Sequence, residues 1–305
     1  MPLHPKTLKA SAREAMRNAA PPAILVTLIY LLLTQVLVEV VYTVMPSASL
    51  DDLFYGQGNG SLMALFLTIL LIIYQAVMNF GYSCWALRTA RGEESGLSTL
   101  MDGFGMVGRV LLMEITITLS ILGWTLLLAL GYAMAVVPVM FTVSGSAGIF
   151  TVVLLTLIFY VAVFAVGLRY DLAHFLLCDY PDAGAGKAVR RCLDMIRGRL
   201  WALMKLYLSF WPWYLLTFLL GLAVVGISLI PVLGEFMNFY HSGSLDAMSL
   251  ILHTAMSGAL ASASATLLSI PLKLFFQPYQ RITVANFYRA LSLEGAAQAP
   301  SESEY

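Results

Sequence analysis

The stretch from Ile115 to Leu168 contains no charged residue, and this limits the possible folds of the chain more than any other feature. A membrane-spanning helix needs roughly 20 mostly apolar residues, so the stretch must contain most of two such helices. The segment from Ser144 to Gly148 is the only good turn between them, which predicts a tight hairpin. Lipid offers the backbone no hydrogen-bonding partner, so helices are expected rather than irregular segments.

Similar apolar stretches recur along the chain and predict six spanning helices. These lie near residues 20–44, 62–87, 110–141, 148–168, 203–230 and 247–272. The composition agrees, because 60% of the residues are apolar and 11% are charged, with a mean hydropathy of +0.83. An average soluble domain is closer to half apolar and a quarter charged. The sequence therefore predicts an all-α, polytopic membrane protein and argues against a soluble globular enzyme.

The positive charges predict the direction of the spans. All 17 Lys and Arg residues lie before span 1, between spans 2 and 3, between spans 4 and 5, or after span 6. Some of them lie within one turn of a span. The acidic residues of the other three loops are Asp51, Asp52, Glu235 and Asp246. Because cytoplasmic loops carry the excess of Lys and Arg, both termini are expected in the cytoplasm.

The sequence lacks the usual motifs for catalysis, metal binding and cofactor binding. Cys84, Cys178 and Cys192 have no CxxC spacing and no nearby pair of histidines, which argues against a metal site or a disulfide framework. All three fall on the expected cytoplasmic side, so free thiols are predicted. The GxGxxG pattern from Gly103 to Gly108 precedes a spanning helix, whereas a nucleotide-binding fingerprint follows a strand. No cofactor, no metal ion and no enzymatic activity are therefore expected.

A threefold pattern divides the chain. A short amphipathic segment precedes each of spans 1, 3 and 5, and these segments end at Asn18, Gly108 and Gly198, which are 90 residues apart. Asn and Gly tolerate the left-handed conformation that often ends a helix. We therefore expect three helical hairpins, each preceded by a cytoplasmic interfacial helix. They form pseudo-repeats at about 7–91, 97–178 and 181–290 in one domain, residues 1–292, followed by a polar disordered tail, residues 293–305.

The third amphipathic segment, from about Pro181 to Gly198, carries the first candidate site. Its apolar positions recur at helical spacing, at residues 188, 189, 192, 193 and 196. The opposite face carries four basic residues: Lys187, Arg190, Arg191 and Arg197. A basic amphipathic helix is typical of a membrane surface, so this face is a candidate for binding anionic lipid or a protein partner. The alternative is that these charges serve only to set the topology.

A polar cluster near the end of span 4 is the second candidate site. Its members are Glu114, Arg169, Asp171, His174, Asp179 and Asp182. A charge inside a span is costly unless it is paired, so Glu114 is expected to pair with Arg109 or Arg169. Asp179 and Asp182 flank Pro181 and fit the positive end of a following helix. The alternative for these carboxylates is a cytoplasmic docking or ion site.

The last predicted hairpin has two unusual spans. Pro212 removes a backbone hydrogen bond and is expected to kink span 5. Span 6 is rich in Ala, Ser, Gly and Thr over residues 255–266, which favours close helix packing and predicts that this helix is the most buried.

Several landmarks occur in a fixed order along nearly the whole chain. They are Leu8-Lys9-Ala-Ser-Ala-Arg13, Arg91-Gly92-Glu93, Asp102-Gly-Phe104, Asp179-Tyr-Pro181-Asp182 with Ala188 and Gly198, Leu208-Ser209-Phe210 with Trp213, and Gln277-Pro278-Tyr279 with Phe287-Tyr288. Together they resemble a family of uncharacterised bacterial integral membrane proteins, the domain of unknown function number 975. That family is distantly similar to the membrane domain attached to some glycerophosphodiester phosphodiesterases, which is not their catalytic part. The resemblance implies a membrane fold and a bacterial origin but no activity.

These observations predict a non-enzymatic, multi-pass protein of the bacterial plasma membrane. Its partners would be the lipid bilayer, in particular anionic lipid, or an unidentified membrane or cytoplasmic protein, and no nucleic acid is expected. The alternative function is a small-solute transporter or permease, because internal repeats and interrupted spans recur in transporters. Pro138, Pro212 and Pro271 interrupt predicted spans, but charged groups near the bilayer midplane are missing from the predicted topology.

Overall fold

The computed structural model describes residues 4–44, 59–143, 145–230, 233–234, 237 and 247–298, and this part of the chain contains helices and no strand. The helical segments are α1 (Pro5–Asn18), α2 (Ala23–Leu31), η1 (Leu32–Val36), α3 (Leu37–Val44), α5 (Asn59–Arg91), η2 (Leu97–Met106), α6 (Val107–Thr142), α7 (Ser146–Leu168), α8 (Ala173–Asp179), η3 (Pro181–Ala183), α9 (Ala185–Ile196), α10 (Leu200–Leu208), α11 (Trp211–Ser228) and α13 (Ala247–Gln298). The predicted all-α class is confirmed for these residues.

Several helices are long and apolar enough to cross a membrane. Four such stretches occur in the described residues, at Ala23–Val41, Leu62–Arg91, Leu97–Thr142 and Ser146–Asp179. A fifth is formed by α10 and α11 if this bent pair is counted as one span. The outward faces of these helices carry large exposed apolar side chains, which a bilayer would cover. A protein with several helices capable of spanning the membrane is therefore confirmed.

The break between α10 and α11 confirms the predicted kink in span 5. The two helices meet at an angle of 53°. Pro212 lies in the first turn of α11, where its missing N–H costs no intrahelical hydrogen bond. The carbonyl of Phe210 accepts hydrogen bonds from the backbone N–H groups of Trp213 and Tyr214, so the new helix starts at the break. Pro138 and Pro271, by contrast, lie inside α6 and α13.

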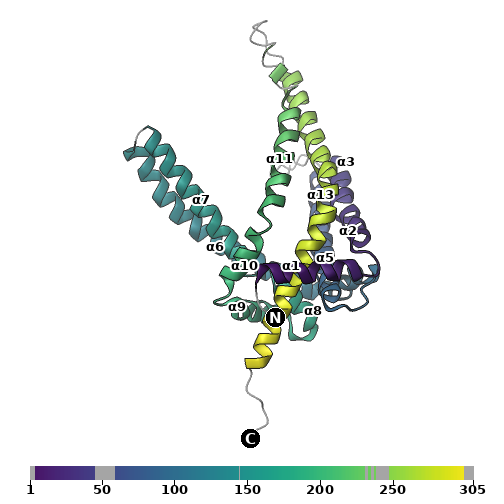
Figure 1. Cartoon of the computed structure of the whole chain (residues 1–305). Helices are drawn as coiled ribbons and strands as arrows, with labels where there is room; N and C mark the ends of the chain where they lie inside the picture. Colours follow the sequence, from purple (N-terminus) through teal and green to yellow (C-terminus); the bar gives the residue numbers. More distant parts are fainter. Residues whose placement is uncertain are drawn as a thin grey trace.

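Helices α6 and α7 form an antiparallel pair that leans away from the other long helices, as Figure 1 shows. The turn between them passes through Gly145, whose φ of +75° is in the left-handed region that favours glycine. Gly148 has a Cα so close to the carbonyl of Val143 that a Cβ there would overlap the oxygen. The two glycines allow the connection to be as short as the sequence predicts, and Ser144 itself lies outside the described residues.

The first and third amphipathic segments fold as α-helices, whereas the second folds as a 3-10 helix. Helix α1 ends at Asn18, and α9 ends at Ile196 shortly before Gly198, which has a φ of +79°. The second segment is the 3-10 helix η2, which runs directly into α6, so Gly108 lies inside α6 and does not end a helix. The segment η2 packs closely on α5, where Gly81 leaves no room for a Cβ beside the Leu100 backbone.

The buried core lies at one end of the molecule and is formed by α1, α5, α8, α9 and the C-terminal half of α13. Its largest fully buried side chains include Trp85, Tyr82, Phe175 and Tyr288. In Figure 1, the turn between α6 and α7 and the end of α11 lie on the opposite side from α1, α8 and α9. The side that the sequence predicts to be cytoplasmic thus also contains the buried core.

The structure joins Cys84 of α5 with Cys178 of α8 as a disulfide, with their Cα atoms 5.8 Å apart. The prediction of free thiols is therefore wrong for these two residues. They are separated by 94 residues in the sequence and meet because α8 folds back against α5. Cys192 of α9 is free and buried, and burial raises the pKa of its thiol to about 12.

Some predictions fall outside the described part of the chain. The acidic loops around Asp51 and Asp246 and residues 299–305 are in this group, and so are the side chains of residues 247–263. The expected burial of the small-residue stretch in span 6 is therefore untested. The backbone of α13 continues to Gln298.

Candidate functional site

The polar residues after α7 lie against α13, where they form the most buried ion pair among those described. Nη1 of Arg281 donates to Oδ1 of Asp171 at 3.2 Å, and the two side chains are 17% and 18% exposed. Nη2 of Arg281 donates to Oγ of Ser83 at 2.9 Å. The hydroxyl of Tyr207 donates to Oδ2 of Asp171 at 2.6 Å. Both charged groups thus have several hydrogen-bonding partners, which a buried ion pair requires.

The charge of Arg281 is retained in this environment. Burial lowers the pKa of the guanidinium most strongly, but the Asp171 carboxylate and the nearby tyrosines together raise it by more, so the pKa is above its usual range. The guanidinium also lies over the ring of Phe175, with 5.6 Å from Cζ to the ring centroid. Sequence reasoning included Asp171 in the candidate cluster but counted Arg281 only as one of the 17 charges that set the topology.

Glu114 has a different partner from the two arginines expected. Its Oε1 lies 2.7 Å from Nε2 of His174, and the side chains are 26% and 11% exposed. Arg109 instead donates to the carbonyl of Pro181, and Arg169 lies over the ring of Trp124. The acid is paired as the sequence requires, but the partner is the histidine that follows α7.

Pro181 starts the short 3-10 helix η3 and Asp182 lies in its first turn, as expected, whereas the next α-helix, α9, begins only at Ala185. Asp179 is the last residue of α8, and its Oδ2 accepts hydrogen bonds from Arg91 at 2.6 Å and from the hydroxyl of Tyr288 at 2.8 Å. Asp182 lies 3.4 Å from Arg109, and its side chain is 95% exposed. The predicted cluster is therefore split into separate pairs along and beside α8, and Asp171–Arg281 is the most buried of them.

Helix α9 presents the candidate basic face to solvent. Lys187, Arg190, Arg191 and Arg197 are all exposed. Lys187, Arg190 and Arg191 line a cavity of about 330 Å³ together with Leu176, Tyr180, Ala188 and Asp194. The Arg191 guanidinium lies 4.6 Å from the ring centroid of Tyr180, which holds it beside the cavity.

The apolar face of α9 differs from the prediction of an interfacial helix. Ala188, Val189, Cys192 and Ile196 are at most 4% exposed and belong to the core cluster of the protein. The face packs against α6 and α8, so it is covered by protein and is not free to enter the membrane surface. Its small side chains favour this close packing.

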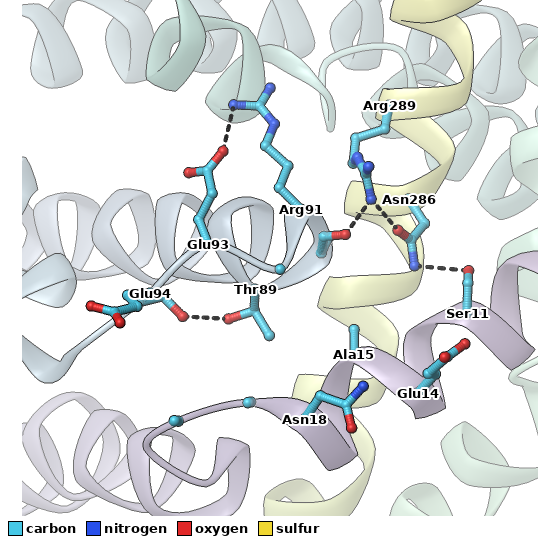
Figure 2. A pocket seen from close by; sticks show the side chains of 15 residues that line it. Ser11, Glu14, Ala15, Asn18, Thr89, Arg91, Glu93, Glu94, Asn286 and Arg289 are labelled. Atoms are coloured by element: carbon cyan, nitrogen blue, oxygen red, sulfur yellow. Dashed lines mark hydrogen bonds and ion pairs between the residues drawn. The ribbon is translucent and has the colours of Figure 1, made fainter.

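A second polar cavity, of about 450 Å³, lies where α1, the end of α5 and α13 meet (Figure 2). Nδ2 of Asn286 donates to Oγ of Ser11 at 3.1 Å, and Arg289 donates to the carbonyl of Ala90 and to Asn286. Charged side chains of both signs line it: Glu14, Arg91, Glu93, Glu94 and Arg289. The hydrogen bonds hold the three segments together and leave a cavity open to solvent.

Two further features were missed by sequence reasoning. Nζ of Lys273 donates to Oε1 of Gln35 at 2.6 Å, between α13 and η1. Residues Leu32–Val36 form a π-helical turn, which has no signature in the amino-acid sequence. The other feature is an apolar groove between α7 and the bent pair α10–α11, which depends on the angle between two helices.

Within the described residues, no group of three or more His, Cys, Asp or Glu side chains could hold a metal ion.

The helices and their apolar faces define this chain as an all-helical protein with several helices able to span a membrane. It belongs to the family described as "Protein of unknown function (DUF975)", which it matches over residues 1–294. The family resemblance expected from the ordered landmarks is thereby confirmed. No curated protein and no solved structure matches the chain. The expected similarity to the membrane domain of glycerophosphodiester phosphodiesterases stays a prediction.

The buried ion pair gives a prediction about stability. Asp171→Asn leaves the Arg281 guanidinium without its counter-charge, and breaking a buried pair in this way costs about 3–5 kcal/mol. We expect a correspondingly lower free energy of unfolding in an SDS titration of the protein in mixed micelles. The double variant with Arg281→Gln should recover part of the loss, because no charge is then left buried.

Asp182→Asn is the matched control, since it removes the same functional group from the exposed pair with Arg109. Exposed ion pairs contribute little, so this variant should unfold like the original protein. Equal stability of Asp171→Asn and Asp182→Asn would show that the buried pair does not stabilise the fold.

Proposed function

We propose that the protein is a non-enzymatic scaffold of the bacterial plasma membrane that binds anionic lipid through the basic face of α9. The observation that carries this proposal is the cavity beside α9, where three exposed basic side chains, Lys187, Arg190 and Arg191, lie together. Asp194 is the only acidic residue among those lining it. Arginine side chains bind phosphate oxygens in a two-pronged geometry, so the surface suits the phosphate of a lipid headgroup.

The proposal includes six spans with both termini in the cytoplasm. Five follow from the apolar helices if α10 and α11 count as one bent span. We assign the sixth to the part of α13 that begins at residue 247 and continues past Lys273; it lies alongside α11 in Figure 1. The basic face of α9 then lies on the cytoplasmic side, where the inner leaflet presents anionic headgroups.

Cysteine labelling of intact cells tests this topology. Ser146→Cys in the α6–α7 turn should react with a membrane-impermeant maleimide, whereas Lys187→Cys should react only after the cells are permeabilised. Both positions are exposed, and the original protein is a suitable background because Cys84 and Cys192 are buried and Cys178 is partly buried against the core. Labelling of Lys187→Cys in intact cells would invert the orientation and contradict the proposal.

Lipid binding is tested by removing the charges of α9. Each basic residue near an anionic surface contributes about 1 kcal/mol. The triple variant Lys187→Gln, Arg190→Gln and Arg191→Gln should therefore bind phosphatidylglycerol on the order of 100-fold more weakly. The measurement is native mass spectrometry of the detergent-solubilised protein with phosphatidylglycerol, and phosphatidylcholine is the uncharged comparison. Added salt should weaken the original binding in the same direction, because exposed charges are screened.

The matched control carries the same charge change on α1, as Lys6→Gln, Arg13→Gln and Arg17→Gln, which are exposed as well. It should keep its preference for phosphatidylglycerol. If both triple variants lose the same affinity, only net charge matters and α9 is no binding site. If neither loses affinity, the charges of α9 serve only the topology and the proposal fails.

A second function, small-solute transport, is favoured by the pair formed by Lys273 and Gln35. Gln35 lies 12 residues after Ala23, the first residue of α2, which is about 18 Å along a helix and so near the middle of a bilayer. An ionisable group at this depth is a functional-site candidate. The pair also joins two helix irregularities that are frequent at binding sites, the π-helical turn and the segment after Pro271.

Chloride efflux from liposomes that contain the purified protein tests the second function. An ammonium group in the span would attract a small anion, so Lys273→Gln should reduce the efflux to that of protein-free liposomes. Lys6→Gln, which removes an exposed lysine of α1, should leave it unchanged. If the original protein gives no efflux above protein-free liposomes, this second candidate is contradicted for chloride.

A further inference from the structure

The break between α10 and α11 creates an apolar groove against α7. The groove has a volume of about 420 Å³. In its wall, the ring of Phe164 on α7 meets the ring of Tyr207 on α10 edge-on, with 6.1 Å between the ring centroids. Beyond this contact α7 and α11 diverge, as Figure 1 shows, because α11 leaves α10 at an angle of 53°. The groove is thus built by the backbone bend and does not depend on a single side chain.

The groove faces the region that lipid occupies. Tyr160 on one wall is 66% exposed, and Trp201 and Trp211 on the other are 60% and 58% exposed. Aromatic residues of this kind gather where the hydrocarbon meets the headgroups. Tyr160 lies nine residues before Arg169, which corresponds to about 14 Å along α7. The groove therefore extends from the cytoplasmic interface into the hydrocarbon.

Lys205 is the only charged residue among those lining the groove. It is exposed, and its Nζ lies 5.5 Å from the ring centroid of Trp201. Tyr207 has its hydroxyl directed away, to the carboxylate of Asp171. The groove thus combines an apolar interior with a single positive charge, and no acid among its lining residues neutralises that charge.

We propose that this groove binds one acyl chain of a phospholipid whose anionic headgroup pairs with Lys205. The proposal deepens the lipid-binding function proposed above and rests on it for the membrane location. A helix from a partner is a poor fit, because a helix is about 10 Å wide and only about one turn would fit into 420 Å³. A lipid tail is thin and apolar, and a phosphate supplies the charge that complements Lys205.

The groove and the basic face of α9 are expected to bind different parts of a lipid. The face of α9 contacts a headgroup only, so it should bind phosphatidylglycerol with short or long chains alike. The groove requires a long chain. The test therefore uses the detergent-solubilised full chain in native mass spectrometry, with dioleoyl-phosphatidylglycerol, dihexanoyl-phosphatidylglycerol and dioleoyl-phosphatidylcholine as separate probes.

Two variants address the two parts of the groove. Val161→Trp places a bulky ring inside it and should weaken binding of both dioleoyl lipids at least tenfold while leaving the dihexanoyl lipid unaffected. Lys205→Gln should lower the preference for dioleoyl-phosphatidylglycerol over dioleoyl-phosphatidylcholine about fivefold, which corresponds to the ~1 kcal/mol that a basic residue contributes near an anionic surface. Val161→Phe serves as a milder filling variant if Val161→Trp fails to fold.

Each of the two groove variants has a control variant that makes a similar change outside the groove. Leu157→Trp adds a ring to α7 at a residue that is 60% exposed and does not line the groove, and Lys187→Gln removes a charge from α9. Leu157→Trp should bind all three lipids like the original protein, and Lys187→Gln should keep the chain-length dependence.

Three results would overturn the proposal. The first is unchanged dioleoyl-lipid binding in folded Val161→Trp and Val161→Phe, and the second is an unchanged headgroup preference in Lys205→Gln. The third is loss of a dimer in Val161→Trp, which would identify a second copy of the chain as the occupant. A different result would show that the α9 face is not a lipid-binding site. In that case the triple variant of α9 binds dihexanoyl-phosphatidylglycerol like the original protein, while the groove variants still behave as expected.

Discussion

The ion pair between Arg281 and Asp171 connects parts of the chain that are far apart in the sequence. Arg281 belongs to α13, Asp171 to the turn before α8, Ser83 to α5 and Tyr207 to α10. These elements come from all three predicted pseudo-repeats. A charge that is mostly buried is tolerated only when its partners are held in place, so the pair fixes how these elements meet at one end of the molecule.

Sequence reasoning worked where one physical rule dominates. The cost of an unpaired backbone in lipid makes any long apolar stretch a helix, which is why the all-α class and the α6–α7 turn at Gly145 could be predicted. The kink in span 5 was also predicted from Pro212, although the structure places this residue just after the break, in the first turn of α11. Pairing could not be predicted in the same way. Glu114 required a partner, but whether an arginine or His174 supplies it depends on how α8 folds back, which the helical periodicity does not contain.

The same limit explains why the most buried cation was missed. All 17 Lys and Arg residues contribute equally to the positive-inside pattern, so the sequence alone does not separate Arg281 from exposed residues such as Arg190. The disulfide between Cys84 and Cys178 was excluded on spacing and compartment, yet the two residues meet through the α5–α8 contact. Lys273 was placed just after a span because the span was bounded by its first charge, whereas the structure gives it an amide partner on the π-helical turn.

An amphipathic pattern shows that one face of a helix is covered, but it does not show what covers it. In α9 the apolar face consists mainly of small residues such as Ala188 and Cys192, and α6 and α8 lie close against it. In α10 and the start of α11 the outward side chains include the large rings of Trp201 and Trp211, which remain exposed. In this pair of helices, the face with small apolar side chains packs on protein, and the face with large rings stays exposed. This division leaves α9 to provide charge and α10 to provide apolar contact.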